Sequence, residues 1–214
     1  MNAGQSPLEW AARRQKKARK GVRRKVLAWV GLNAEAARAD RLAVRAAHGA
    51  VGEQWTAALL ARLPAGWRVW HGLRIPGFRH DLDHVLVSPC GTAVVVLDSK
   101  RWHAGWRTRL VDGRVWCGEE DRHEKVEAVG KYAARLHKAL ALPGVVVWPL
   151  LVVHGSPIEG GRLEVRVPAW SGTVHVLGPD WLVPTLATAP KVLDPARAAA
   201  VAARVAQVLV PAGG

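Results

Sequence analysis

Asp81-Leu82-Asp83-His84-Val85-Leu86-Val87, with Asp98-Ser99-Lys100 beginning eleven residues after Val87, is the part of the sequence that decides the fold. The turn residues Pro89-Cys90-Gly91 and an apolar run over 93–97 separate the two motifs. This order predicts two strands joined by a tight turn, and strands joined in this way pair antiparallel. The pairing brings Asp83 close to Asp98. Lys100 follows two residues later, on the same face of its strand.

Two carboxylates and one amine at the end of a strand pair are groups that can hold a divalent cation and activate a water for phosphodiester cleavage. Glu53 lies on a predicted helix, after Gly49 and Gly52, and can add a third carboxylate to such a site. The alternative is that both aspartates are ordinary strand-end residues and that Lys100 is solvated. For an isolated Asp-x-Lys, this alternative is the commoner case.

Positive charge is concentrated at the beginning of the chain. The 214 residues carry a formal net charge of +14, and residues 1–48 hold twelve Lys and Arg against three Asp and Glu. A field of this sign favours polyanions, nucleic acid before an anionic membrane surface. We expect nine cations to contact a phosphate backbone: Arg13, Arg14, Lys16, Lys17, Arg19, Lys20, Arg23, Arg24 and Lys25. An apolar stripe beside these cations, formed by Val22, Val26, Trp29 and Val30, leaves membrane-surface contact by this arm open as another use.

Hydrophobic periodicity and turn residues predict a mixed α/β chain in three parts. These are a basic helical, partly disordered arm over 1–48, a domain over 49–188 with a central mixed sheet flanked by helices, and a C-terminal helix within 189–214 that packs on it. The predicted helices are 49–65, 123–142, 180–186 and 196–209. The predicted strands are 67–73, 83–87, 93–97, 108–111, 114–116, 145–153, 163–167 and 174–177.

Several features limit the cellular setting. No long apolar segment follows the first charges, so we expect no signal peptide. The apolar run from Val26 to Leu32 is shorter than the about 20 residues of a membrane span. Two cysteines, Cys90 and Cys117, do not make a disulfide framework or a zinc site on their own and are interpreted as ordinary small residues. We therefore expect a cytoplasmic protein.

Two other patterns invite a function. His80 and His84 flank the aspartates, with His103 and His123 downstream, but a His-x-x-x-His spacing across a loop-to-strand junction does not put both rings on one helical face for zinc. The segment 101–109 interleaves cations with aromatic rings, as single-strand binders do. Since the chain has eleven Trp but one Phe and one Tyr, Trp102 is interpreted as a packing residue.

Four pieces of this sequence together resemble the NERD (nuclease-related) domain, which is placed in the PD-(D/E)xK, restriction-endonuclease-like superfamily. They are Gly52-Glu53, the strand motif Asp81–Val87, Pro89-x-Gly91, and Leu97-Asp98-Ser99-Lys100-x-Trp102-x-x-Gly105. The resemblance covers roughly residues 49–150.

The resemblance implies a restriction-endonuclease-like core and an active-site set of Glu53, Asp83, Asp98 and Lys100. It implies that Mg²⁺ or Mn²⁺ is held by Glu53, Asp83, Asp98 and the carbonyl of Ser99, and that Lys100 positions the nucleophile. Many relatives have Glu where Asp98 stands. A Gln on the following helix, common in relatives, is replaced here by Glu127 or Glu124.

The sequence thus predicts a metal-dependent nuclease that acts on DNA, with an arm that binds phosphates. The rival prediction is a non-catalytic nucleic-acid-binding or scaffold protein that keeps the nuclease fold.

Overall fold

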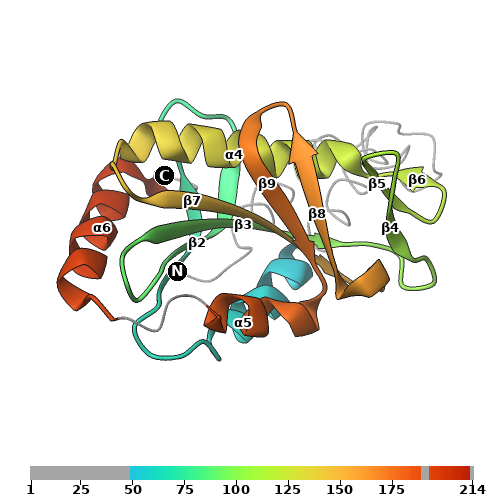
Figure 1. The fold of residues 1–214 in the computed structure, drawn as a ribbon, viewed down its shortest axis with the longest axis horizontal. Helices are drawn as coiled ribbons and strands as arrows, with labels where there is room; N and C mark the ends of the chain where they lie inside the picture. The colour runs from blue at the N-terminus through green and yellow to red at the C-terminus, as the bar shows by residue number, and fades with distance from the viewer. Residues whose placement is uncertain (1–48, 189–192, 213–214) are drawn as a thin grey trace, which may run out of the picture.

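A mixed sheet of seven strands organises the described part of the protein (Figure 1). The computed structural model describes residues 49–188 and 193–212, so the predicted arm over 1–48 lies outside the described residues. The sheet order is β10-β1-β2-β3-β7-β9-β8. Its strands are β1 (Arg68–Arg74), β2 (Asp81–Val87), β3 (Ala93–Arg101), β7 (Val146–His154), β8 (Arg162–Val167), β9 (Trp170–Leu177) and β10 (Val210–Pro211).

The connections explain the directions of the strands. A short turn joins β2 to β3, and the two strands pair antiparallel, as predicted. His84 lies opposite Leu97. The chain then leaves the sheet for a long crossover and returns as β7, parallel to β3. Parallel neighbours need such a crossover because the chain must travel back to the same end of the sheet. The crossover contains α4 (His123–Leu140) and a small three-stranded sheet.

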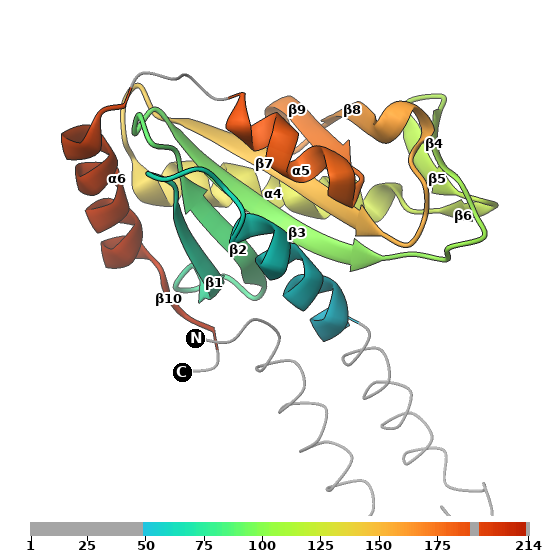
Figure 2. The same cartoon turned by 90° about the horizontal axis from the view of Figure 1, so that it is seen from below.

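Helices cover both faces of the large sheet (Figure 2). One core cluster joins α4 and α6 (Pro195–Val208) to Val94 and Val96 of β3. Another joins α5 (Pro179–Ala187) and Leu60, the end of helix 49–60, to Val95 and Leu97. Side chains alternate along a strand. Asp98 and Lys100 therefore share the α4 face, and Ser99 points to the face of helix 49–60.

The small sheet consists of β4 (Thr108–Val111), β5 (Arg114–Cys117) and β6 (Glu120–Asp121). The predicted hairpin turns at Asp112 and Gly113, both with positive φ, as a two-residue hairpin turn requires. Ser156, just beyond β7, fastens this sheet to the large one, because its hydroxyl hydrogen-bonds Thr108 at 2.7 Å and the Trp106 carbonyl at 2.6 Å. Cys117 is buried and free, as is Cys90, in agreement with their interpretation as ordinary small residues.

The secondary-structure predictions hold in outline, with corrections at the ends. The first helix ends at residue 60 rather than 65, since the chain turns before Pro64. Neither β6 nor β10 was predicted, because each has only two residues. The predicted C-terminal helix corresponds to α6, which packs on the β1, β2 and α4 core. None of the described helices combines the length and apolarity needed to cross a membrane.

Candidate active site

Asp83 and Ser99 meet at the end of the β2–β3 pair. Beyond the last paired residues, the Ser99 N–H donates to the carboxylate of Asp83, with N and Oδ2 2.7 Å apart. The carboxylate thus binds a main-chain donor of β3 that the neighbouring strand leaves unpaired at this point. Burial raises the pKa of Asp83 well above its usual range, and the negative charge of Asp98 raises it further. The hydrogen bond from Ser99 opposes this rise without reversing it.

Asp98 and Lys100 form an ion pair on the α4 face of β3. Asp98 is buried, with 5% of its surface exposed, whereas about a third of the Lys100 side chain is exposed. The Lys100 ammonium also donates to the Ser99 carbonyl at 3.2 Å. Burial by itself lowers the pKa of Lys100, but the charges of Asp98 and Asp83 outweigh it, so the pKa is raised. Lys100 is therefore a cation at neutral pH.

Glu53 approaches the same charges from helix 49–60. Its pKa is raised by burial, lowered by the charge of Lys100 and raised again by Asp98 and Asp81. Gly52 lets the helix sit close to the end of β3, because a Cβ at this position would already lie 4.0 Å from the Lys100 carbonyl carbon. A larger side chain than Ala at position 52 would push the helix, and Glu53 with it, away from the strand.

Tyr132 is a residue near the candidate site that the sequence did not single out. It lies on α4, and its pKa is raised to about 12 by burial and by the negative charges of Asp98, Asp83 and Asp81. Its ring packs edge-on against Phe78, with ring centroids 5.9 Å apart, and near His80 at the same distance. A neutral phenol thus stands beside the carboxylates. The available signal was that Tyr132 is the single tyrosine of the chain, on the helix that follows the Asp-x-Lys strand.

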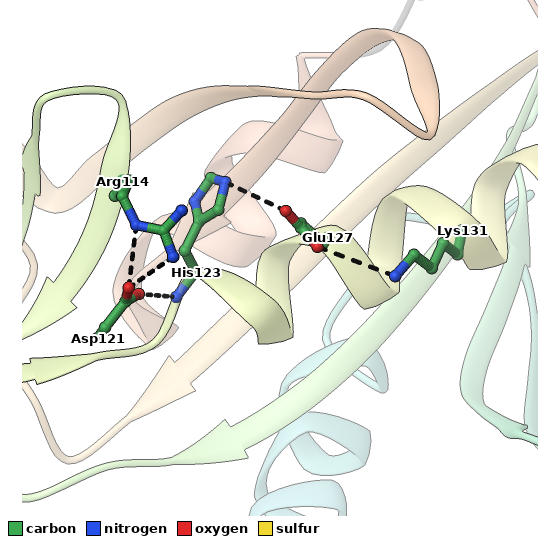
Figure 3. Close-up of polar contacts among 5 residues, drawn as sticks. All are labelled: Arg114, Asp121, His123, Glu127 and Lys131. Carbon is green, nitrogen blue, oxygen red and sulfur yellow. Dashed lines mark hydrogen bonds and ion pairs between the residues drawn. The ribbon is translucent and has the colours of Figure 1, made fainter.

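The two glutamates predicted to replace the family's Gln have other partners. Glu127 lies between His123 and Lys131, with a nitrogen–oxygen distance of 3.8 Å to each (Figure 3). Glu124 is largely exposed and pairs with Lys125 at 2.7 Å. At the start of the helix, Asp121 accepts the His123 N–H at 2.9 Å and pairs with Arg114 (Figure 3). On α4, the charges of Asp98, Asp83 and Asp81 raise the pKa of Tyr132, and the replacement of the Gln by Glu127 or Glu124 stays a prediction.

The four histidines that raised the question of zinc lie in four different environments. His84 is buried, with its Nδ1 2.7 Å from Nδ1 of His71, and burial lowers its pKa to about 3. His80 packs by Phe78 and Tyr132, and His103 by Trp106. Within residues 49–188 and 193–212, no three or more His, Cys, Asp or Glu side chains form a group ready to hold a metal ion.

A second polar cluster supports the site from the other face of the sheet. The Ser99 hydroxyl donates to the Thr56 hydroxyl at 2.9 Å, and Thr56 hydrogen-bonds Nε2 of His154 at 2.8 Å. All three residues are buried. Buried polar groups without partners are costly, so this chain of hydrogen bonds fixes helix 49–60 on the ends of β3 and β7. It thereby fixes the position from which Glu53 approaches.

The protein is thus of a mixed α/β class with carboxylates and a lysine gathered where two antiparallel strands end. Its sequence matches the family described as "Nuclease-related domain" over residues 48–154, half of the chain. The protein belongs to this family, NERD, which confirms the resemblance. The match includes Glu53, Asp83, Asp98 and Lys100 and ends at the last residue of β7. Comparisons with curated proteins and with solved structures give no match.

Proposed function

We propose that this protein is a metal-dependent nuclease that hydrolyses phosphodiester bonds in DNA, and that its core is restriction-endonuclease-like. One observation carries the proposal. Asp83 is held on the Ser99 amide, and Asp98 pairs with Lys100, at the end of the strand pair that Glu53 approaches. Family membership makes nucleic acid the expected substrate.

The donors at this site suit a divalent cation. Glu53, Asp83 and Asp98 offer carboxylate oxygens and Ser99 a carbonyl oxygen, the ligand types that Mg²⁺ and Mn²⁺ prefer. The raised pKa values of Asp83 and Glu53 support this fit, since they reflect negative charges that burial and mutual repulsion leave poorly compensated. When bound, the metal ion supplies positive charge that polarises the phosphate and makes a water a better nucleophile at neutral pH.

The protein's own groups divide the remaining tasks. Lys100, a cation whose side chain is about a third exposed, can hold the attacking water or a phosphate oxygen and stabilise the charge that develops on the phosphate. Asp83 keeps its orientation through the Ser99 amide. Tyr132 is a neutral hydroxyl at neutral pH, as a tyrosine of ordinary pKa already is, and it can donate a hydrogen bond to a phosphate oxygen.

Cleavage assays on site variants test this proposal. We expect the protein to degrade plasmid DNA with Mg²⁺ or Mn²⁺ and to stop when a chelator is added. Asp98→Ala and Lys100→Ala should each reduce the rate by about 100-fold or more, because each removes a charge that acts on the transition state. Lys125→Ala and Asp180→Asn are matched controls, since these residues lie elsewhere, on α4 and α5, and should leave the rate unchanged. Site variants that are folded and cut as fast as the wild type would contradict the assignment.

The second candidate function is binding of nucleic acid without turnover. It is favoured by the lack of a ready group of three metal-binding side chains among the described residues, and by the Asp98–Lys100 ion pair, which already neutralises one carboxylate. If this second function is correct, the protein binds DNA but shows no cleavage with Mg²⁺ or Mn²⁺.

The basic arm, outside the described residues, is proposed to hold the DNA backbone. The nine cations between residues 13 and 25 can meet about five phosphates, which gives a slope of roughly −4.5 in log K against log salt concentration. Removing residues 1–30 should flatten that slope and weaken binding equally for all sequences. An unchanged slope would assign the phosphate contacts to the domain. Flotation of both proteins with anionic vesicles tests the membrane alternative.

A further inference from the structure

The segment that follows Lys100 separates into buried and exposed aromatic residues. Trp102 is 6% exposed and packs in the core under the small sheet, with the guanidinium of Arg122 5.9 Å from its ring centroid. It is a packing residue, as predicted. The neighbouring Arg101 and Trp106 are exposed, so they are not needed for the core.

Arg101 reaches the opposite face of the strand from Trp102 and covers an exposed indole. Its guanidinium carbon lies 5.2 Å from the ring centroid of Trp55, a residue of helix 49–60 whose surface is 45% exposed. The ring of His154 lies 5.5 Å from the same indole. A Trp is large and apolar, and nearly half of this one faces water beside a cation. Arg101 and His154 are register partners in β3 and β7, so the two side chains that contact the Trp55 ring come from paired positions of the sheet.

Trp106 offers a second exposed indole in the same neighbourhood. Its surface is 38% exposed, and its ring lies 4.8 Å from that of His103. A Cβ on Gly118 would come within 2.7 Å of this ring, so the indole lies directly on the glycine. Its carbonyl is held by Ser156, two residues beyond His154. The main chain of Trp106 and the ring of Trp55 therefore both lie near the end of β7.

The Trp55–Arg101 pair stands next to the proposed catalytic lysine. Arg101 is the residue after Lys100, and the two side chains leave β3 on opposite faces. A chain of nucleotides that crosses the end of the strand can therefore contact Lys100 with one phosphate and Arg101 with another. The exposed Arg107 and Arg109 continue the positive charge along the same segment. An aromatic surface with interleaved cations suits unpaired bases, since every base can stack while its phosphate meets a cation. The bases of a duplex are stacked on each other and cannot use such a surface.

We propose that Trp55, Arg101 and Trp106 form a stacking surface for single-stranded nucleic acid beside the site. This proposal rests on the nuclease function proposed above, and it assigns unpaired strands or strand ends as the preferred substrate. Trp55 and Trp106 stack on bases, and Arg101 fixes the Trp55 ring and binds a phosphate.

Binding of the full-length protein to labelled oligonucleotides, measured by fluorescence anisotropy in EDTA, tests the proposal. The probes are oligo-dT and oligo-U of about 20 nucleotides, longer than typical single-strand sites, and a DNA duplex of the same length. Trp55→Ala and Trp106→Ala should each weaken binding of the tighter single strand about tenfold or more, and leave duplex binding within about twofold. Trp55→Phe should retain most of the affinity, because a phenyl ring can still stack. The preference between oligo-dT and oligo-U, with oligo-dU as the control for the thymine methyl group, identifies the sugar.

Trp181→Ala is the matched control. Trp181 is 44% exposed and lies on α5, so it reports the effect of removing any exposed indole. Equal binding of the single strand by wild type, Trp55→Ala and Trp106→Ala would overturn the proposal, as would an equal loss for duplex. Because EDTA prevents cleavage, this result is independent of the nuclease assay. A protein that binds single strands without cleaving them shows the expected loss in this binding assay but no activity in the cleavage assay. A nuclease that binds DNA through another surface cleaves DNA but shows no loss of binding in these variants.

Discussion

At the turn end of the β2–β3 pair, polar side chains hydrogen-bond one another. At the other end, charged side chains lie close together. The turn end has Cys90 between the hydroxyls of Ser88 and Thr92, at 3.3 and 2.9 Å. The far end has the Asp83 carboxylate with a raised pKa and the Asp98–Lys100 ion pair. The same two strands thus contribute stability at one end and carry an electrostatic cost at the other. Such a cost is common where a site is prepared for a ligand or a reaction.

The turn end is also fixed from outside. Gly91 has a φ of +63° and lies against α6, where a Cβ would come 2.6 Å from the Ala198 nitrogen. Arg197 of α6 donates to the Gly91 carbonyl at 3.2 Å and to the Gly144 carbonyl at 2.9 Å. This helix therefore closes the turn end of the sheet, whereas the far end of β3 stays partly open to solvent at Lys100.

The largest expected effect on stability comes from Gly91→Ala. The new methyl group meets the α6 backbone and sits in a left-handed conformation, which together should lower the free energy of unfolding by about 2–4 kcal/mol. Gly113→Ala is the control, because Gly113 has a φ of +74° but no atom within 4 Å of the added Cβ. It should cost about 1–2 kcal/mol. Urea unfolding measures both values.

The stabilising role assigned to the turn end would be wrong if Gly91→Ala were no more destabilising than Gly113→Ala. The contrast between the two ends would fail if the folded Gly91→Ala protein lost DNA cleavage, since that would connect the turn end with the chemistry at the far end.

Asp83→Asn is expected to have a smaller effect on the free energy of unfolding, and to maintain or raise it rather than lower it. The amide oxygen can still accept the Ser99 N–H, while the substitution removes one of the crowded negative charges. Without divalent cations, this variant should be at least as stable as the wild type. Ca²⁺ or Mg²⁺ at ten times its Kd should stabilise the wild type by about 1.4 kcal/mol, or roughly 3–6 °C in Tm.

The Asp83→Asn variant should lose most of that cation shift, which thermal unfolding with and without the ion measures directly. A wild type that shows no shift with either cation would favour the non-catalytic binding protein. A shift that Asp83→Asn retains in full would place the cation elsewhere on the molecule.

The sequence predicted elements well where local pattern decides them. The apolar runs, the Asp112-Gly113 turn and the tight β2–β3 connection gave the right strands and the antiparallel pair. The parallel pairing of β3 with β7 has no local signal, because it depends on how the crossover packs. The sequence did not single out Tyr132 for a related reason, and the replacement of the family's Gln by Glu127 or Glu124 stays a prediction. Residues 127 and 132 lie about 140° apart around a helix, and only tertiary packing decides which face meets the site.

Trp55 could not be predicted as part of a surface for the same reason. Its neighbours, Arg101 and His154, are distant in the sequence and come together only through the β3–β7 pairing. For Glu53, Asp83, Asp98 and Lys100, the motif alone predicted the roles, and these roles remain predictions until the variants are assayed.

Ser99 makes three contacts with three different groups of its own. Its N–H binds Asp83, its carbonyl accepts from Lys100, and its hydroxyl binds Thr56 on the other side of the sheet. The first two contacts use the main chain, which every residue type except proline supplies in full. A substitution at this central position of the Asp-x-Lys motif can therefore keep the main-chain contacts with Asp83 and Lys100. What such a change alters is the docking of helix 49–60, so drift at this one position can retune how Glu53 approaches while the strand motif stays intact.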